Sequence, residues 1–115
     1  MSQEIQNYLP LTETTVFILL SLVHEAKHGY AIMKEVQTLS DNRIILSTGT
    51  LYGALKRLLA LGWIQRVGDP TPNQTQRVRK AYALTDLGNR VLNAEIQRLN
   101  ALLNIVQFRK AEGEI

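Results

Sequence analysis

Two histidines and a glutamate in the first third of the chain have a spacing that could bind a metal ion. The stretch VHEAKHGY, residues 23–30, contains the pattern His24-Glu25-x-x-His28. On one continuous helix, two histidines four residues apart can bind zinc, and the glutamate can act as a general base in peptide hydrolysis. The pattern therefore raises the hypothesis of a zinc-dependent protease.

The neighbouring residues argue against a zinc site. Gly29 directly follows His28, where we expect a helix to end, so the histidines would not share an unbroken helical face. A zinc site also needs a third protein ligand. No histidine follows His28, and residues 42–68 contain no Asp, Glu or His. We therefore expect no metal, no cofactor and no enzymatic activity, and we interpret the pattern as a corner between two helices.

Length and composition indicate one domain with a real core, because the chain has 115 residues and 45% of them are hydrophobic. It has no cysteine, which suits a reducing compartment. The longest apolar run, residues 16–23, is far shorter than the roughly 20 residues of a membrane helix. The N-terminus also lacks the basic start of a secretion signal. We expect a cytoplasmic protein that does not bind membranes.

The charges are unevenly distributed. The whole chain has a formal net charge of +3. Residues 42–85 contain seven basic residues and one acidic residue, a net charge of +6, and the remainder carries −3. Such a concentration of positive charge favours a polyanionic partner.

Hydrophobic periodicity and turn residues predict four helices, a short strand and a hairpin. The expected helices are Leu11–Glu25, Tyr30–Leu39, Ser47–Gly62 and a long one that Thr85 caps, and the expected strands are Arg43–Leu46, Trp63–Val67 and Arg77–Leu84. Ser47 is a suitable N-cap and Gly62 a suitable C-terminal residue of the third helix. Its buried face would consist of Leu51, Leu55 and Leu58. The buried face of the second helix would consist of Ile32, Val36 and Leu39.

This order of elements is that of a winged helix-turn-helix, and several motifs within it resemble the PadR family of bacterial transcription regulators. The resemblance covers about Leu11 to Gly88. It rests on His28-Gly29-Tyr30-Ala31-Ile32, on Gly49-Thr50-Leu51-Tyr52 followed by Leu55 and Arg57-Leu58, on Gly62-Trp63-Ile64, and on Tyr82-Ala83-Leu84-Thr85 with Gly88. Thr48 and Gly53 stand where the family often has proline, and Pro70 and Pro72 make the wing tip unusual.

The resemblance implies a mainly α fold with a small β-hairpin wing and a long C-terminal dimerisation helix. It implies three segments: a flexible arm at residues 1–10, a DNA-binding domain at 11–85, and a dimerisation helix and tail at 86–115. The partners it implies are double-stranded DNA and a second copy of the chain, and some members of the family sense a small hydrophobic or aromatic effector at or near the dimer interface. Regulators of this kind are usually repressors.

The third helix has the properties of a recognition helix. Small residues, Gly49 and Gly53, lie on its outer face beside Lys56, where they would let the backbone approach a DNA groove. The alternative is that these glycines admit a neighbouring element. The full set of expected DNA-binding residues is Tyr30, Lys34, Ser47, Thr48, Gly49, Thr50, Tyr52, Gly53, Lys56, Arg57, Gln74, Gln76, Arg77, Arg79 and Lys80.

Tyr30 and the hairpin residues of that set each have an alternative interpretation. Tyr30 could belong to the core, and the charged hairpin could be a solvated surface. Arg57 lies at the flank of the helix, where we expect it to meet a phosphate or an acidic side chain.

The last helix carries a heptad-like apolar seam, which we expect to form the dimer interface. The interface residues are Leu92, Ile96, Leu99, Leu102, Leu103, Val106 and Phe108. The alternative is that the seam packs on the chain's own core. A rival function is a winged helix that contacts only proteins, against which the basic charge of residues 42–85 argues.

Overall fold

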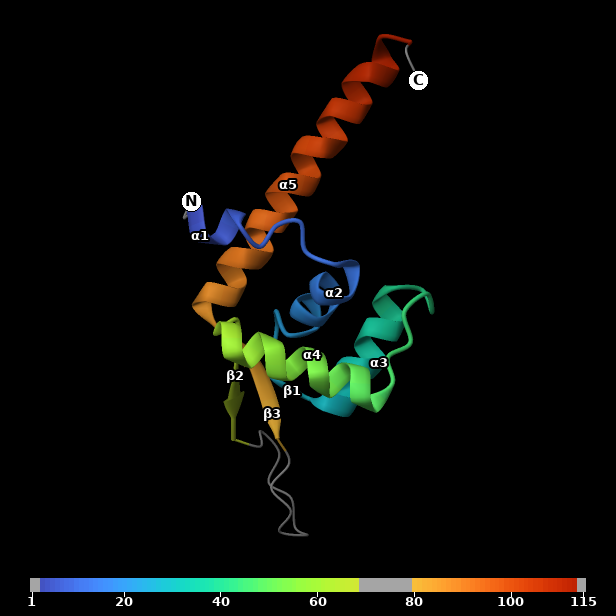
Figure 1. Ribbon diagram of the computed structural model, residues 1–115. Helices are drawn as coiled ribbons and strands as arrows, with labels where there is room; N and C mark the ends of the chain where they lie inside the picture. Colours follow the sequence, from blue (N-terminus) through green and yellow to red (C-terminus); the bar gives the residue numbers. More distant parts are fainter. Residues whose placement is uncertain (1–2, 69–79, 114–115) are drawn as a thin grey trace.

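The computed structural model describes residues 3–68 and 80–113 and has the order of elements of a winged helix-turn-helix (Figure 1). The prediction of a mainly helical fold with a small β wing and a long C-terminal helix is confirmed. The three strands form one antiparallel sheet in the order β1-β3-β2. The elements are α1 (Gln3–Gln6), α2 (Glu13–Ser21), β1 (Lys27–His28), α3 (Gly29–Leu39), α4 (Thr48–Leu61), β2 (Ile64–Val67), β3 (Ala81–Leu84) and α5 (Asp86–Ala111).

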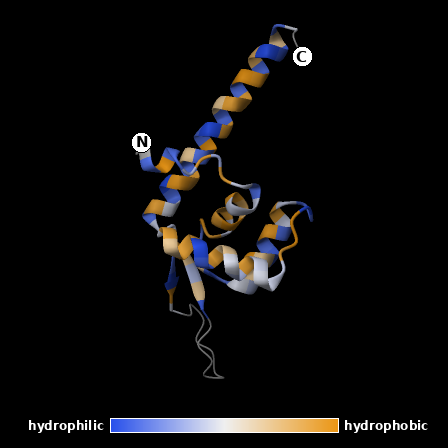
Figure 2. Cartoon of the chain, viewed as in Figure 1, coloured by the Kyte–Doolittle hydropathy of each residue, from blue (hydrophilic) through white to orange (hydrophobic). Residues whose placement is uncertain are grey.

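Helix α2 lies at the centre of the core because it is apolar on nearly every side. Ile18 and Leu19 are fully buried, and α2 packs against both α3 and α5. The predicted inner face of α4 is confirmed, since Leu51, Leu55 and Leu58 are buried. Figure 2 shows that apolar residues continue along the part of α5 that projects beyond this core.

The corner before α3 differs from the sequence-based prediction. Helix α2 ends at Ser21 rather than near Glu25, and Lys27–His28 form strand β1, which pairs with β3. The Lys27 ammonium donates a hydrogen bond to the Ser21 carbonyl oxygen at 2.7 Å. Gly29 therefore begins α3 instead of ending α2. The strand was missed because β3, which supplies its hydrogen-bond partners, lies far along the chain.

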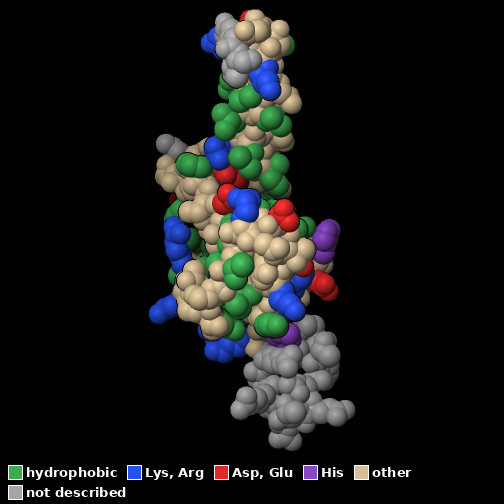
Figure 3. All heavy atoms as spheres, turned by 90° about the vertical axis from the view of Figure 1, so that its right-hand side faces the viewer, with side chains coloured by type: hydrophobic (Ala, Val, Ile, Leu, Met, Phe, Trp, Pro, Cys, Tyr) green, Lys and Arg blue, Asp and Glu red, His purple; other side chains and the backbone are tan. Residues whose placement is uncertain are grey.

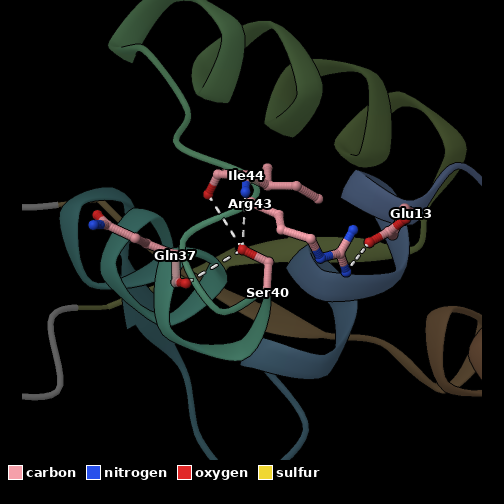
Figure 4. Close-up of polar contacts among 5 residues, drawn as sticks. All are labelled: Glu13, Gln37, Ser40, Arg43 and Ile44. Atoms are coloured by element: carbon pink, nitrogen blue, oxygen red, sulfur yellow. Dashed lines mark hydrogen bonds and ion pairs between the residues drawn. The ribbon is translucent and has the colours of Figure 1, made fainter.

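The turn between α3 and α4 replaces the strand expected at Arg43–Leu46, and that prediction is wrong. Asp41 and Asn42 adopt the left-handed conformation, with φ of 54° and 65°, which Asp and Asn tolerate better than most residues. The Ser40 hydroxyl oxygen accepts a hydrogen bond from the Ile44 N–H at 3.0 Å (Figure 4). The Ile44 N–H, which in a strand would donate to a neighbouring strand, therefore has its hydrogen-bond partner inside the turn.

The end of α3 is less buried than the sequence suggested. Ile32 and Val36 are fully buried as predicted, but the Leu39 side chain is 43% exposed. Leu39 is the last residue of α3, beyond the reach of the core that covers the two preceding turns.

Residues 4–10 of the N-terminal segment pack on the domain, whereas we expected a loose arm over residues 1–10. Ile5 on α1 is buried in the core, and α1 contacts α5. The Tyr8 ring meets the Trp63 ring edge-on, with centroids 5.3 Å apart and planes at 87°. Such aromatic contacts are stabilising and fix the path of the segment.

Helix α5 begins in close contact with the residues that follow α4. A Cβ atom at position 88 would clash with the Trp63 carbonyl oxygen, so the close approach requires Gly88. The same carbonyl accepts a hydrogen bond from the Thr85 N–H at 3.1 Å, and the Thr85 hydroxyl donates to the Gly62 carbonyl at 2.6 Å. Thr85 also accepts from the Gly88 N–H at 3.0 Å, which confirms it as the N-cap.

A buried carboxylate that the sequence did not single out joins α5 to the N-terminal segment. Glu95 is 1% exposed and accepts two hydrogen bonds of 2.8 Å from Arg98, one turn away. The hydrogen bonds from Arg98 and a backbone hydrogen bond from Leu11 lower the pKa of Glu95 below its ordinary value of 4.5, although burial opposes the shift. Its ionised form is therefore part of the folded state.

None of the helices within residues 3–68 and 80–113 combines the length and the apolar character needed to cross a bilayer.

Gly88→Ala tests the close contact between α5 and Trp63. Because the new methyl group would meet the Trp63 backbone, which cannot turn aside as a flexible side chain can, we expect a loss of at least about 1–3 kcal/mol of unfolding free energy. Urea unfolding measures this loss. Gly49→Ala is the control, since a Cβ at Gly49 meets no described atom within 4 Å. Equal stability of the two variants would contradict the assignment.

Glu95→Gln tests the buried ion pair. A carboxyl group whose pKa is lowered by folding stabilises the protein above its unfolded pKa, and that contribution is lost as the pH falls through the folded pKa. The unfolding temperature of the native protein should therefore fall on acidification below about pH 4.5, and Glu95→Gln should start lower at pH 7 and lose less. Glu112→Gln, at an exposed position, is the control. An identical pH profile for native protein and Glu95→Gln would show that Glu95 is not involved.

Candidate nucleic-acid interface

The outer face of α4 presents a continuous set of small and polar side chains to solvent. The N-cap prediction holds, because Ser47 accepts a hydrogen bond from the Thr50 N–H at 3.2 Å, and Gly62 ends the helix in the left-handed conformation with φ 77°. The exposed residues include all eight that the sequence assigned to this helix and its cap: Ser47, Thr48, Gly49, Thr50, Tyr52, Gly53, Lys56 and Arg57.

The two glycines of this face do not serve packing within the described part of the chain. A Cβ atom at Gly49 or at Gly53 would meet no described atom within 4 Å. The alternative that a neighbouring element fills the space above them therefore has no support in residues 3–68 and 80–113. The two glycines leave a strip of backbone on the outside of α4 that no side chain of their own covers, with Lys56 beside it.

Tyr52 is held in a defined position at the edge of this strip. A Cβ atom at Gly29 would lie 2.5 Å from the Tyr52 hydroxyl oxygen, so the end of the Tyr52 side chain occupies space beside residue 29 that a larger side chain would need. The ring is 45% exposed. Burial, and next the proximity of Tyr52, raise the pKa of Tyr82 on β3. Tyr52 therefore lies between α3, the sheet and solvent, with its ring already oriented.

Helix α3 adds a polar surface next to α4. Tyr30 is 63% exposed, which contradicts the alternative that it belongs to the core. The Lys34 ammonium lies 5.3 Å from the centre of the Tyr30 ring, a favourable cation–π distance. Both residues are therefore accessible, as the sequence-based interpretation required.

The wing is described only at its base. Gln74, Gln76, Arg77 and Arg79 lie outside the described residues, as do the first three residues of the strand predicted at Arg77–Leu84. Lys80 is exposed and precedes β3, which begins at Ala81. The Lys80 carbonyl oxygen is 3.3 Å from His28 Nδ1, which brings the base of the wing next to β1.

Arg66 on β2 is a candidate residue that the sequence analysis counted as charge but did not assign to the site. It is exposed, faces Tyr82 in the β2–β3 register, and acts to lower the pKa of that tyrosine. Its positive charge on a predicted strand of the wing could have identified it, whereas strict alternation would have placed it on the face of buried Ile64; Gln65 and Arg66 are the two exposed residues of the strand. Figure 3 shows Lys and Arg side chains around the lower end of the globular part, next to the wing.

Two other arginines of the basic segment have different surroundings. Arg43 forms an ion pair with Glu13 at the start of α2 (Figure 4), and its pKa is raised by that hydrogen bond. Its charge is therefore partly neutralised within the chain. Arg57 lines a small pocket of about 60 Å³ with Thr12 and Thr15 of the same α2 terminus, which places it at the flank of α4 as expected.

The histidine pattern cannot form the helix that a zinc protease requires. His24 lies in the turn after α2, and His28 lies in β1. In the part of the chain that the structure describes, no three His, Cys, Asp or Glu side chains are grouped so as to hold a metal ion.

The projecting part of α5 exposes a row of large apolar side chains. Their exposed fractions lie between 39% and 64%, for Ile96, Leu99, Leu102, Leu103, Ile105, Val106 and Phe108. Leu92 is an exception, since it is 2% exposed and belongs to the chain's own core. Its assignment to a dimer interface is therefore wrong, because the same heptad spacing serves the core in the first part of α5 and a solvent-facing row beyond it.

The comparisons with known proteins agree with this architecture. The profile of the family described as "Transcriptional regulator PadR-like family" matches residues 18–94, well over half of the chain. A search of curated protein sequences gave no match.

Solved structures with the same fold are numerous. A PadR family transcription regulator from Clostridium difficile R20291 has a TM-score of 0.69 and 25% identity, over 84% of this chain and 96% of that one. A transcriptional regulator from Clostridium thermocellum has a TM-score of 0.66 and 23% identity, over 92% and 96%.

Another similar structure contains DNA. It is Bacillus subtilis PadR in complex with operator DNA, with a TM-score of 0.65 and 25% identity, over 76% of this chain and 48% of that one. The family match, the winged-helix fold and these structural relatives lead to one conclusion: the chain belongs to the PadR-like family, whose members are transcriptional regulators and not enzymes.

Proposed function

We propose that two copies of this chain bind a pseudo-palindromic DNA operator in a sequence-specific manner and repress transcription by occupying it. The observation that carries the proposal is the open strip on α4, where Gly49 and Gly53 leave the outer face free of contacts with the described residues beside exposed Lys56. The DNA complex of Bacillus subtilis PadR, a structural relative, supports a nucleic-acid partner for the same fold.

In this proposal α4 enters the major groove. A major groove is about 12 Å wide and admits one helix, so bulk on the outer face limits how closely the helix can approach the bases. Glycine in a helix interior costs roughly 0.5–1 kcal/mol relative to alanine. The two glycines have no packing role among the described residues. The close approach of DNA to the helix would account for their presence. Lys56 would then reach a guanine edge or a phosphate.

The surrounding residues would bind the phosphate backbone. Tyr52 and Tyr30 offer hydroxyl groups, and exposed positive charge comes from Lys34 on α3, Arg57 on α4 and Lys80 at the base of the wing. Contacts of this kind position the protein on DNA without reading the sequence. Gln74, Gln76, Arg77 and Arg79 of the wing remain candidates from the sequence alone.

The second copy would pair through the projecting part of α5. This helix has 26 residues, about 39 Å, and its exposed apolar row lies beyond the reach of the chain's own core. An exposed apolar row of this length is typical of an interaction surface, and a heptad-like spacing favours a helical partner. A dimer would carry two α4 helices, which fits a two-fold operator with half-sites about one DNA turn apart.

Release of the operator by a small hydrophobic or aromatic effector is part of the proposal, by analogy with the family. The rival function, a winged helix that binds only proteins, is separated from DNA binding by salt dependence. Neutralising phosphates releases counterions, so the affinity for DNA falls steeply as the salt concentration rises.

Lys56→Ala should weaken binding to duplex fragments that the native protein selects from genomic DNA. We expect a loss of about 1–3 kcal/mol of binding free energy per monomer, because Lys56 would contact the groove directly. If the contact is a phosphate, the salt slope of the dimer should also fall by about two. Fluorescence anisotropy at several salt concentrations measures both quantities. Lys110→Ala, on the far end of α5, is the control, and an affinity equal to that of native protein would remove Lys56 from the interface.

Gly53→Ala should change folding and DNA binding in opposite directions. Because the site is open, the methyl group should raise the free energy of unfolding by roughly 0.5–1 kcal/mol. In DNA the same methyl group would stand between α4 and the groove, so the affinity should fall. Urea unfolding and anisotropy on one preparation test both effects, with Asn104→Ala on α5 as the control. A more stable variant with unchanged affinity would show that α4 does not approach DNA through this strip.

Leu99→Asp should produce monomers with much weaker DNA binding, since it places a charge in the middle of the exposed apolar row. Gel filtration with light scattering measures the mass. Gln97→Asp adds the same charge at an exposed position outside the row and should remain dimeric. Persistence of a dimer in Leu99→Asp would refute the assignment of the interface.

A further inference from the structure

The missing side chain of Gly53 leaves a hollow about the size of one methyl group on the outer face of α4. Gly53 is exposed, and a Cβ atom at this position would meet no described atom within 4 Å. Residues three and four positions apart lie beside one another on the surface of a helix. The rim of the hollow therefore consists of the four residues at these spacings: Gly49, Thr50, Lys56 and Arg57.

The floor of this hollow is apolar and offers no hydrogen bond. Gly53 lies inside α4, where its backbone N–H and carbonyl oxygen bond to residues one turn before and one turn after it. Only its Cα–H group faces outward. The rim adds little polarity, because the Thr50 hydroxyl oxygen already accepts a hydrogen bond from the Ser47 hydroxyl at 2.9 Å, and the stems of Lys56 and Arg57 are aliphatic. A group that enters the hollow must therefore be small and apolar.

The edges of the base pairs in a major groove contain one group of this kind. Guanine presents two acceptors there, cytosine a donor, and adenine one of each, whereas thymine presents an acceptor and its 5-methyl group. A polar edge placed against the hollow would lose its water without gaining a partner, which is unfavourable. A methyl group instead gains by leaving water, and it makes van der Waals contacts with the floor and the rim.

We propose that Gly53 recognises a thymine in each half-site of the operator by accommodating its 5-methyl group in this hollow. The inference rests on the proposed function and adds the identity of the base that faces the middle of α4. The methyl group fills the space that a Cβ atom would occupy in any other residue. The 5-methyl group of 5-methylcytosine has the same size and position, so it fits the same hollow.

Removal of single methyl groups from the operator tests the proposal directly. Deoxyuridine differs from thymidine only in lacking the 5-methyl group, and it pairs with adenine in the same way. Each thymine of an operator selected from genomic DNA is replaced by uracil in both half-sites at once, and the affinity of full-length native protein is measured by fluorescence anisotropy. For one symmetric pair of thymines we expect the affinity to fall roughly ten- to twenty-fold, which is about four-fold for each buried methyl group. Thymines between the half-sites are the control and should leave the affinity nearly unchanged.

Gly53→Ala shows whether Gly53 is the residue that recognises the methyl group. The alanine methyl group occupies the hollow, so this variant should bind the thymine operator more weakly than native protein does. Uracil at the sensitive pair makes room for the alanine, so it should restore binding, and the preference for thymine should be lost or reversed. The new Cβ meets no described atom within 4 Å, so the variant should fold. Lys34→Ala, on the neighbouring helix α3, is the control: it should weaken binding to both operators and keep the preference.

Methylated cytosine separates the methyl group from the rest of the base. Cytosine at the sensitive pair should weaken binding, because it removes the methyl group and places an unpaired donor against the hollow. Methylation of those cytosines at C5 should recover part of the loss for native protein and none of it for Gly53→Ala. Equal affinity of native protein for the cytosine and 5-methylcytosine operators would contradict the proposal.

Two further results would overturn it. One is sequence-specific binding that no uracil substitution weakens, because α4 would then meet the DNA through other groups at Gly53, and the proposed function would still stand. The other is a preference for thymine that Gly53→Ala retains in full, since a different residue would then recognise the methyl group. If native protein selected no DNA at all, the proposed function and this inference would fail together.

Discussion

The close approach of Gly88 to the Trp63 carbonyl oxygen is the constraint on which the rest of the architecture depends. The peptide after α4 and the first turn of α5 meet there without an intervening side chain, and hydrogen bonds from Thr85 to the Gly62 and Trp63 carbonyls hold them in register. This contact fixes the direction in which α5 leaves the domain relative to α4 (Figure 1). In a dimer joined through α5, the same angle would set the separation of the two recognition helices, so a local backbone contact would determine which operator spacing fits.

The local features of the fold could be predicted from the sequence because their causes are local. Ser47, Gly62 and Thr85 are caps whose hydrogen bonds lie within one turn, and the leucines of α4 repeat with the helical period. Strand β1 and helix α1 could not be predicted in this way. Both are stabilised by partners distant in sequence, β3 in one case and α5 with Trp63 in the other. Leu92 was misassigned for a related reason, since heptad spacing does not reveal where the core ends.

The candidate site likewise has features that could be predicted from the sequence and features that could not. Exposure of the α4 face follows from its periodicity, and the structure agrees with it. The contact of Tyr52 with Gly29 and the ion pair of Arg43 with Glu13 depend on tertiary packing, and they change which groups are available: the first orients a ring, and the second partly neutralises a cation. The position of Glu95 could have been predicted from the sequence, because the spacing of Gly88, Val91, Glu95 and Arg98 places them on one face of α5. In the structure Gly88, Val91 and Glu95 of that face are all buried. The function of the wing still rests on the sequence alone.

Methylation protection of operator DNA tests the central claim most directly, because dimethyl sulfate modifies guanine N7 in the major groove. If α4 of each copy lies in that groove, bound protein should protect guanines in two clusters about 10 base pairs apart, or a small multiple of that spacing, related by two-fold symmetry. Binding that leaves every guanine N7 reactive, or that protects a single cluster per bound dimer, would contradict the account.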